Sequence, residues 1–261
     1  MKRKQKKHSA RKKTRKILRS SRRVQLKKQN TIENPEKLWE VANNHLLSDN
    51  PLGALPYLSK LVDFDPNDGI LLFNYGACLA QTGDFQAATI PLEKAREIGT
   101  RIGQLPHLLG TCYFNVGQYD KSISIYKGAI ESTPADTELV NRLWWLLDQF
   151  QRHDEAIEFF SRMNSQSGRS PLIVQYLGEA FKKVGREEDA DIIFSEILKM
   201  DSDNKHALEY LAGRKIVNGE PFQAIDLYRR ASILSEPFDS IQSAYLMSLN
   251  YADTASQQDI I

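Results

Sequence analysis

The chain has 261 residues, of which 41% are hydrophobic and 26% charged, as is ordinary for a water-soluble protein. No stretch approaches the 18 consecutive apolar residues of a membrane-spanning helix, and no apolar segment follows the basic start as in a secretory signal peptide. The formal net charge of +2 hides an asymmetry: residues 1–30 contain 15 Lys or Arg and no Asp or Glu, which leaves 20 basic against 33 acidic residues in the remainder.

Residues 1–34 are predicted to be a basic, partly disordered arm, because like charges repel and few apolar residues are available for a core. A helix is expected only over 11–28, where a thin apolar stripe occurs. One interpretation is binding to nucleic acid or another polyanion, which needs only dense positive charge. The contacting residues would be Lys2, Arg3, Lys4, Lys6, Lys7, Arg11, Lys12, Lys13, Arg15 and Lys16.

Three other interpretations of the arm stay open. A weak attraction to an anionic membrane surface needs the same charges. In a eukaryote the run would be typical of a nuclear localisation signal. The arm can also be a solvated tail that folds back on the acidic body.

From residue 35 onward the sequence repeats every 34 residues, a period typical of stacked two-helix units. Six copies follow without insertion: 35–68, 69–102, 103–136, 137–170, 171–204 and 205–238. The twentieth position of each copy is always small: Ala54, Ala88, Ser122, Ala156, Ala190 and Ala224. The eighth is small in five of six: Ala42, Gly76, Gly110, Gly178 and Ala212, with Trp144 in copy four. Small residues on both helices predict an antiparallel pair with closely spaced backbones.

The turn between the paired helices is predicted at position 15, which is glycine in four copies: Gly83, Gly117, Gly185 and Gly219. Pro66 and Pro134 are expected to follow the ends of second helices, and Ser170–Pro171 to cap and begin a first helix. Copy four departs from the pattern, because Gln151 replaces the turn glycine and Trp144 is large. We expect Trp144 to wedge its two helices apart or to rotate them locally, in a repacked core.

Two copies carry a recognisable set of residues: Tyr75-Gly76, Leu79, Gly83-Asp84-Phe85 and Ala88 in one, and Leu109-Gly110, Tyr113, Gly117-Gln118-Tyr119, Tyr126, Ala129 and Pro134 in the next. On these residues, residues 35–238 resemble the tetratricopeptide repeat family. The resemblance implies an all-α, right-handed α-solenoid of six helix hairpins. It also implies a concave groove, lined by the first helices, that binds a protein or peptide.

Carried over by register, the groove would be lined by Trp39, Asn43, Phe73, Asn74, His107, Thr111, Phe114, Asn141, Trp145, Gln175 and Lys182. The aromatic members would hold apolar side chains of an extended peptide, and the amides would bond its backbone. The alternative for each aromatic residue is packing against the next repeat. We predict no clamp for acidic peptide ends, because Lys182, Lys183 and Arg142 are isolated.

No catalytic, cofactor-binding or metal-binding residue is predicted, so the chain is expected not to be an enzyme by itself. Cys78 and Cys112 stand 34 residues apart and are expected to be reduced and partly buried, because adjacent helices are too far apart for a disulfide. The five histidines have no acidic or cysteine neighbour at metal-ligand or triad spacing. There is no phosphate-cradling, glycine-rich loop.

Residues 239–261 depart from the repeat pattern and are predicted to form a helix that caps the solenoid or begins a further domain. The run Ser243-Ala244-Tyr245-Leu246-Met247-Ser248-Leu249-Asn250-Tyr251 is also similar to the junction that follows the repeats in O-linked N-acetylglucosamine transferase-like (SPINDLY-type) glycosyltransferases. That resemblance implies a substrate-presenting repeat arm whose transferase domain would lie beyond Ile261.

The sequence therefore predicts a protein- or peptide-binding scaffold in the cytoplasm, or in the nucleus of a eukaryote. A repeat arm of a glycosyltransferase and a polyanion-associated protein are the two alternatives.

Overall fold

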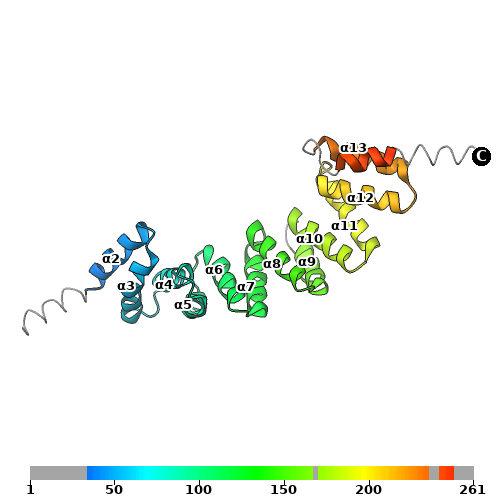
Figure 1. The fold of residues 1–261 in the computed structure, drawn as a ribbon. Helices are drawn as coiled ribbons and strands as arrows, with labels where there is room; N and C mark the ends of the chain where they lie inside the picture. The colour runs from blue at the N-terminus through cyan, green and yellow to red at the C-terminus, as the bar shows by residue number, and fades with distance from the viewer. Residues whose placement is uncertain (1–33, 167–169, 235–240, 250–261) are drawn as a thin grey trace, which may run out of the picture. The chain divides into compact units, whose positions relative to one another are not determined.

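The computed structural model describes residues 34–166, 170–234 and 241–249. Over these residues the chain is helical, without a β-strand, which confirms the predicted all-α class (Figure 1). The basic arm, with all its proposed polyanion contacts, lies outside the described residues. None of the described helices is both long and apolar enough to cross a membrane.

The chain divides into two compact units, described separately below. Unit 1 ends at Ser122 and unit 2 begins at Ile123, so the boundary falls within α7. The helices of unit 1 are α2 (Pro35–Leu47), α3 (Pro51–Phe64), α4 (Gly69–Gln81), α5 (Phe85–Glu97), α6 (Gln104–Asn115) and the start of α7 (Tyr119–Ser132). Unit 2 contains the rest of α7, α8 (Thr137–Gln149), α9 (His153–Gln166), α10 (Pro171–Lys183), α11 (Glu187–Met200), α12 (Lys205–Val217) and α13 (Pro221–Ile233).

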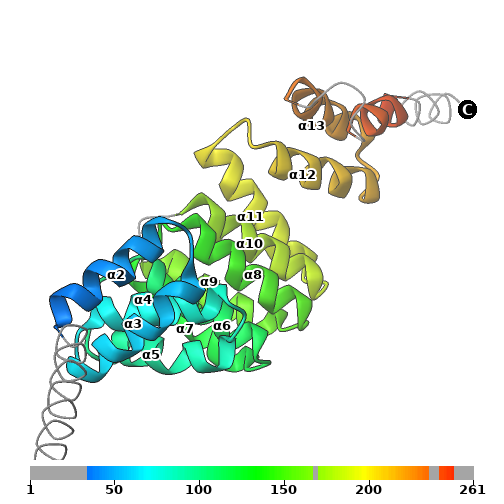
Figure 2. The ribbon, with the colours of Figure 1, turned by 60° about the vertical axis from the view of Figure 1, so that its left-hand side comes forward.

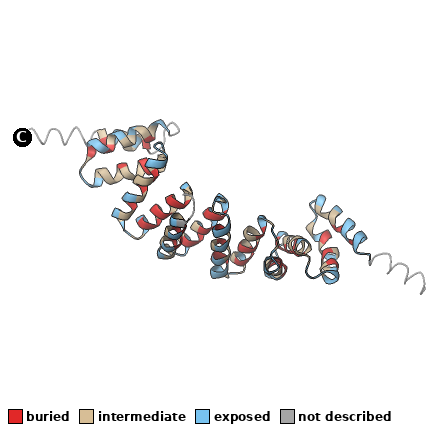
Figure 3. Cartoon of the chain, turned by 180° about the vertical axis from the view of Figure 1, so that it is seen from behind, coloured by how far each residue is buried: buried red, intermediate tan, exposed pale blue. Residues whose placement is uncertain are grey.

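Successive helices pack side by side within each unit. In unit 1, α2 packs on α3, α3 on α4 and α4 on α5 (Figure 2). In unit 2, α10 packs on both α9 and α11, and α12 packs on α13. Buried residues lie on the faces that neighbouring helices share, and exposed residues lie on the outer faces (Figure 3). Each unit is therefore a stack of helix pairs whose core runs between them.

Small residues set the spacing within the pairs, as predicted. All six residues at position 20 are completely buried. A Cβ atom built on Gly76 would lie 2.5 Å from Cγ of Leu92, so no larger residue fits there without a shift. At the corresponding place in the next pair, the Ser122 hydroxyl donates a hydrogen bond to the Gly110 carbonyl over 2.8 Å. The residue at position 8 thus touches the second helix directly.

Every turn at position 15 uses the left-handed backbone region. The four predicted glycines have φ between 74° and 87°. The two copies without glycine reach the same region with Asp49 at φ 49° and Gln151 at φ 54°. After two of these turns a side chain caps the next helix, since Asn50 and Asp84 each accept a backbone N–H group at the starts of α3 and α5. The Asp68 and Asp136 carboxylates each accept two backbone N–H groups at the starts of the first helices α4 and α8. The helix stops before Pro66 and Pro134 are also confirmed.

One local prediction needs correction. Ser170 occupies the N-cap position before Pro171, but its hydroxyl makes no capping hydrogen bond.

The Trp144 indole stacks on Tyr176 of α10, with ring centroids 5.1 Å apart, and also lies 6.3 Å from the His153 ring at the start of α9. The helices α8 and α9 are in much less contact than those of the pairs α4–α5, α10–α11 and α12–α13, as expected for a large ring that wedges its two helices apart.

The two cysteines are buried and free of a disulfide, as predicted, although more deeply buried than expected. Burial raises the pKa of both thiols, that of Cys112 to about 11.

Residues 241–249 form a further helical segment of unit 2. Its Ile241 side chain is buried in a cluster with Leu208 of α12 and Ala231 of α13. The segment therefore packs on the last described helix pair.

Candidate functional site

The predicted groove residues of unit 1 lie on its first helices, α2, α4 and α6. Trp39 is the most accessible aromatic residue among them, at 36% exposure. The others are half-buried: Asn43, Phe73, Asn74, His107, Thr111 and Phe114. Two of these have contacts within their own region, since the Thr111 hydroxyl donates to the His107 carbonyl and the Phe114 ring lies 5.6 Å from that of Tyr119. On most of this surface, only a part of each side chain is therefore accessible to a ligand.

In unit 2 the predicted residues lie on α8 and α10. Asn141 and Trp145 are one turn apart on α8, so both project from the same side of the helix. The Trp145 indole is 48% exposed. Asn141 is exposed, and its side-chain oxygen accepts a hydrogen bond from the Tyr176 hydroxyl over 2.5 Å. Gln175 is half-buried and Lys182 exposed on α10. We call Asn141, Trp145, Gln175 and Lys182 the α8–α10 face.

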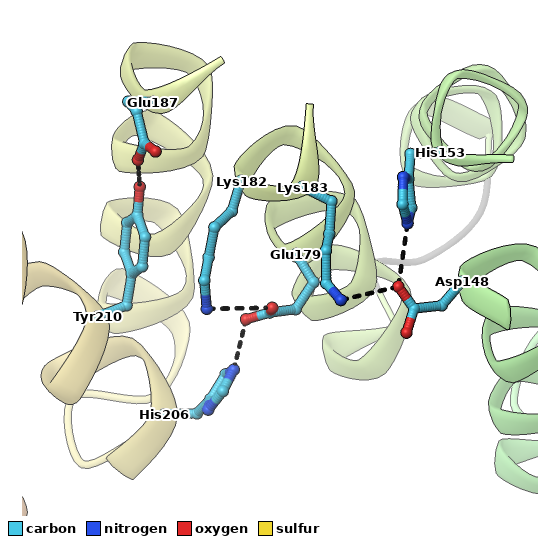
Figure 4. Close-up of polar contacts among 8 residues, drawn as sticks. All are labelled: Asp148, His153, Glu179, Lys182, Lys183, Glu187, His206 and Tyr210. Atoms are coloured by element: carbon cyan, nitrogen blue, oxygen red, sulfur yellow. Dashed lines mark hydrogen bonds and ion pairs between the residues drawn. The ribbon is translucent and has the colours of Figure 1, made fainter. Parts of the chain in front are cut away.

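A set of charged contacts lies beside the α8–α10 face (Figure 4). At its centre the carboxylate of Glu179 on α10 accepts from Nε2 of His206 on α12 over 2.6 Å. The second oxygen of Glu179 lies 3.3 Å from Nζ of Lys182. Burial raises the pKa of the Glu179 carboxyl, but the His206 hydrogen bond and the Lys182 charge outweigh it and hold that pKa below its usual value.

A second carboxylate joins three helices of unit 2. Oδ1 of Asp148 on α8 lies 3.0 Å from Nε2 of His153 on α9 and 2.9 Å from Nζ of Lys183 on α10. The hydrogen bond from His153 and then that from Lys183 lower the pKa of the Asp148 carboxyl. Asp148 thus ties α8 both to α9 of its own pair and to α10 of the next pair.

Tyrosine and arginine contacts link α11 to α12. The Tyr210 hydroxyl donates to Glu187 over 3.0 Å, and burial together with this acceptor raises the pKa of Tyr210. Arg214 makes two hydrogen bonds to the Asp191 carboxylate, at 2.9 and 3.2 Å. These contacts hold successive helices of unit 2 in register.

The histidine prediction was therefore incomplete, because His153 and His206 each have a carboxylate partner. His206 and Glu179 are 27 residues apart in the chain and meet only because α10 and α12 belong to adjacent copies. Lys182 and Lys183, isolated in the sequence, are likewise each paired with a carboxylate. Only the 34-residue register could have predicted the Glu179–His206 contact, because it places position 9 of one copy near position 2 of the next.

Within the described part of the chain, no group of three or more His, Cys, Asp or Glu side chains is placed to hold a metal ion. Each histidine–carboxylate contact in unit 2 involves a lysine as the third charged group. The arrangement is therefore suited to holding helices together and to shaping a charged border for the α8–α10 face.

Comparison with known proteins supports the repeat assignment. Residues 107–136, which hold α7 and most of α6, match the family model described as Tetratricopeptide repeat. The predicted resemblance is confirmed for this helix pair. For the transferase junction it stays a prediction, since residues 250–261 lie outside the described ones.

Two curated relatives match part of the chain. BBSome complex member BBS4 from Bos taurus is 28% identical over 123 residues, which is 47% of this chain and 24% of that protein. Tetratricopeptide repeat protein 21A from Mus musculus is 26% identical over 100 residues, which is 37% of this chain and 8% of that protein. The chain thus matches only a minor part of either relative.

Among solved structures, a tetratricopeptide repeat protein from Parabacteroides merdae has a TM-score of 0.48 at 19% identity, covering 78% of this chain and 80% of that one. The structure described as YrrB, a TPR protein with an unusual peptide-binding site, has a TM-score of 0.48 at 15% identity, covering 75% and 97%.

Proposed function

We propose that this chain is a non-catalytic scaffold that binds a protein or peptide through the exposed faces of its first helices. The observation that carries the proposal is the Trp145 indole, 48% exposed beside the exposed amide of Asn141 on α8. A large aromatic ring next to an amide matches the anchors on which binding energy concentrates in protein interfaces. The bovine relative is by its name a member of a complex, which agrees with an interaction role.

The chemistry of the α8–α10 face defines the ligand we expect. The indole favours an apolar or aromatic side chain, because burying both removes apolar surface from water. Asn141 and Gln175 offer amide groups to the backbone of an extended segment. The neighbouring charges are already paired with one another, Glu179 with His206 and Asp148 with Lys183, so they contribute little attraction for a strongly charged ligand. We expect an extended segment with one apolar anchor and few charges.

The test uses peptides selected from a random display library against the full chain. Their dissociation constants would be measured by fluorescence anisotropy for the wild type and for Trp145→Ala. We expect a loss of about 2 kcal/mol, which is about thirtyfold in the dissociation constant. The dissociation constants of Trp39→Ala, measured in parallel, test whether unit 1 also binds the peptides.

The matched control is Phe222→Ala. This ring is also exposed, at 63%, but it lies at the start of α13, a second helix. Its loss should leave peptide affinity unchanged. Equal affinities of the wild type, Trp145→Ala and Trp39→Ala for every selected peptide would contradict the proposal, as would a failure to select any peptide.

A second candidate function is polyanion binding by the basic arm, favoured by its 15 Lys or Arg and the absence of acidic residues over 1–30. The transferase-arm alternative rests on the resemblance of 243–251 alone, and the coding sequence beyond Ile261 would decide it. We propose a cytoplasmic location together with the scaffold function.

A further inference from the structure

The end of α13 carries a sequence pattern that the scaffold function does not use. Residues 229–233 read Arg-Arg-Ala-Ser-Ile, so Ser232 has arginines three and two places before it and an apolar residue directly after it. In this sequence no other serine or threonine has arginine at both of those places. Basophilic serine kinases select this pattern, because carboxylates of the enzyme pair with the two guanidinium groups and an apolar pocket takes the following side chain.

The side chains that such a kinase would recognise lie at the surface of α13. The Ile233 side chain is 76% exposed. Arg229 lies 2.6 Å from Asp226, and both of these side chains are more than half exposed. Arg230 donates to the carbonyl oxygen of Ser202 and lies near the Asp203 carboxylate. Exposed ion pairs contribute little to stability, so carboxylates in a kinase cleft can displace them.

A kinase cleft binds its substrate in an extended form, so the last turn of α13 must open before Ser232 can react. Ser232 is half-buried, and its hydroxyl donates to the Arg229 carbonyl over 2.8 Å. The helix ends at Ile233, and among residues 229–234 only Ala231 is buried. A helix end that few buried side chains hold in place opens locally at a low free energy.

The position of Ser232 on α13 is the one that meets the next element of the chain. The neighbouring Ala231 is buried in one cluster with Ile241 of the last helical segment, residues 241–249. One copy earlier, the residue equivalent to Ser232 is Leu198 of α11, which packs against the part of this cluster that α12 contributes. The register therefore places Ser232 at the contact between α13 and the last helical segment.

We propose that Ser232 is phosphorylated by a kinase of this class, and that the phosphate releases the last helical segment from α13. In the reaction the Ser232 hydroxyl oxygen attacks the γ-phosphorus of ATP and forms a bond to it. The bond from that phosphorus to the oxygen of the ADP leaving group breaks, and the hydroxyl proton passes to a base of the kinase. The proposal does not depend on peptide binding at the α8–α10 face.

A phosphate on Ser232 would be unfavourable in the folded arrangement. It adds about two negative charges at the C-terminal end of α13, where the helix dipole already concentrates negative partial charge. The last helical segment contains no Lys or Arg that could pair with it. Arg229, one turn earlier, is already paired with Asp226, so the phosphate and that carboxylate would compete for one guanidinium group. A dianion without a full partner destabilises the contact that would bury it.

The first experiment treats the full chain with ATP and purified cyclic-AMP-dependent protein kinase and locates the phosphate by mass spectrometry. Location is needed because Ser9 and Thr14 of the basic arm also follow basic residues. We expect phosphate on Ser232. Arg229→Gln should lower the initial rate at Ser232 about tenfold or more, because a charged hydrogen-bonded contact with the kinase is lost.

The matched control is Arg162→Gln, which removes a half-exposed arginine that pairs with Glu131 elsewhere in unit 2. It should leave the rate at Ser232 unchanged. A synthetic peptide of residues 226–234, offered to the same kinase, tests recognition of the pattern without the fold. Phosphorylation of the peptide but not of Ser232 in the chain would overturn the proposal, as would a failure of both.

The second experiment measures amide hydrogen exchange over residues 241–249 before and after phosphorylation. Exchange in this segment should become about tenfold faster or more, while exchange in α8 and α10 stays unchanged. Ser232→Ala treated with the same kinase should keep the slow exchange, which separates the effect of this site from that of the arm. Unchanged exchange in protein phosphorylated at Ser232 would overturn the proposed release.

Discussion

At the scale of single residues, the turn positions show how one backbone requirement is met by different side chains. Glycine satisfies position 15 in four copies, while Gln151 adopts φ 54° without that freedom. A left-handed conformation costs a residue with a Cβ atom about 1–2 kcal/mol. Copy four therefore carries a local cost that its neighbours lack.

Replacing Gln151 by glycine should remove that cost. We expect Gln151→Gly to raise the free energy of unfolding by about 1 kcal/mol, measured by urea denaturation. The control is Gln149→Gly, two residues earlier at the end of α8, which should lower stability by up to about 1 kcal/mol because the backbone there is helical. A destabilising Gln151→Gly would mean that the amide side chain contributes more than the backbone loses.

Contacts within one copy could be predicted from the sequence, whereas contacts between copies could not. The small residues at positions 8 and 20 and the glycines at position 15 act within one copy, so their roles follow from local spacing. The Tyr176–Asn141 and His206–Glu179 contacts span 35 and 27 residues and depend on how one pair sits on the next. The side-chain partners between copies could therefore not be predicted from the sequence pattern, and neither could the stacking of Trp144 on Tyr176.

At the scale of the helices, unit 2 is held together by carboxylates as well as by its apolar core. Glu179 of α10 bonds His206 of α12, while Asp148 of α8 joins Lys183 of α10. The pKa values of both carboxyls lie below their usual values. Groups of this kind stabilise a fold while ionised and lose that contribution on protonation.

The sign of the pH effect follows from these shifts. Because the folded pKa of Glu179 is lowered, its contribution is present above the ordinary glutamate value of 4.5 and is lost as the pH falls through the folded pKa. Denaturation midpoints of unit 2 should therefore fall more steeply below about pH 5 in the wild type than in Glu179→Gln. Glu188→Gln, which alters an exposed carboxyl on α11, should keep the wild-type slope. Parallel slopes for all three proteins would contradict the role given to Glu179.

The same scale shows why the last helical segment was difficult to interpret. Its residues depart from the pattern on which the six copies were aligned. The contact of Ile241 with Leu208 and Ala231 joins elements that are distant in the chain, so no local spacing predicts it.

At the scale of the whole chain, charge is distributed very unevenly. The first 30 residues carry 15 basic side chains, and the remainder has an excess of acidic ones. If the arm binds polyanions, deletion of residues 1–30 should abolish retention on immobilised single-stranded RNA at about 50 mM salt, and raising the salt should release the intact protein. Absence of retention of the intact chain at low salt would exclude this function.

The control for that experiment keeps the arm and alters the body. Trp145→Ala should bind RNA as the wild type does, because the α8–α10 face has no part in the arm's charge. A loss of retention in this variant would instead place nucleic-acid contacts on the repeats.

Unit 1 contains a natural reporter of its own opening. Cys78 and Cys112 occupy matching positions on α4 and α6, and both thiols are buried with raised pKa values. A thiol reagent can reach them only when these helices separate from their neighbours. The rate of labelling of the unmodified chain therefore measures how often the packing around α4 and α6 loosens, without any engineered probe.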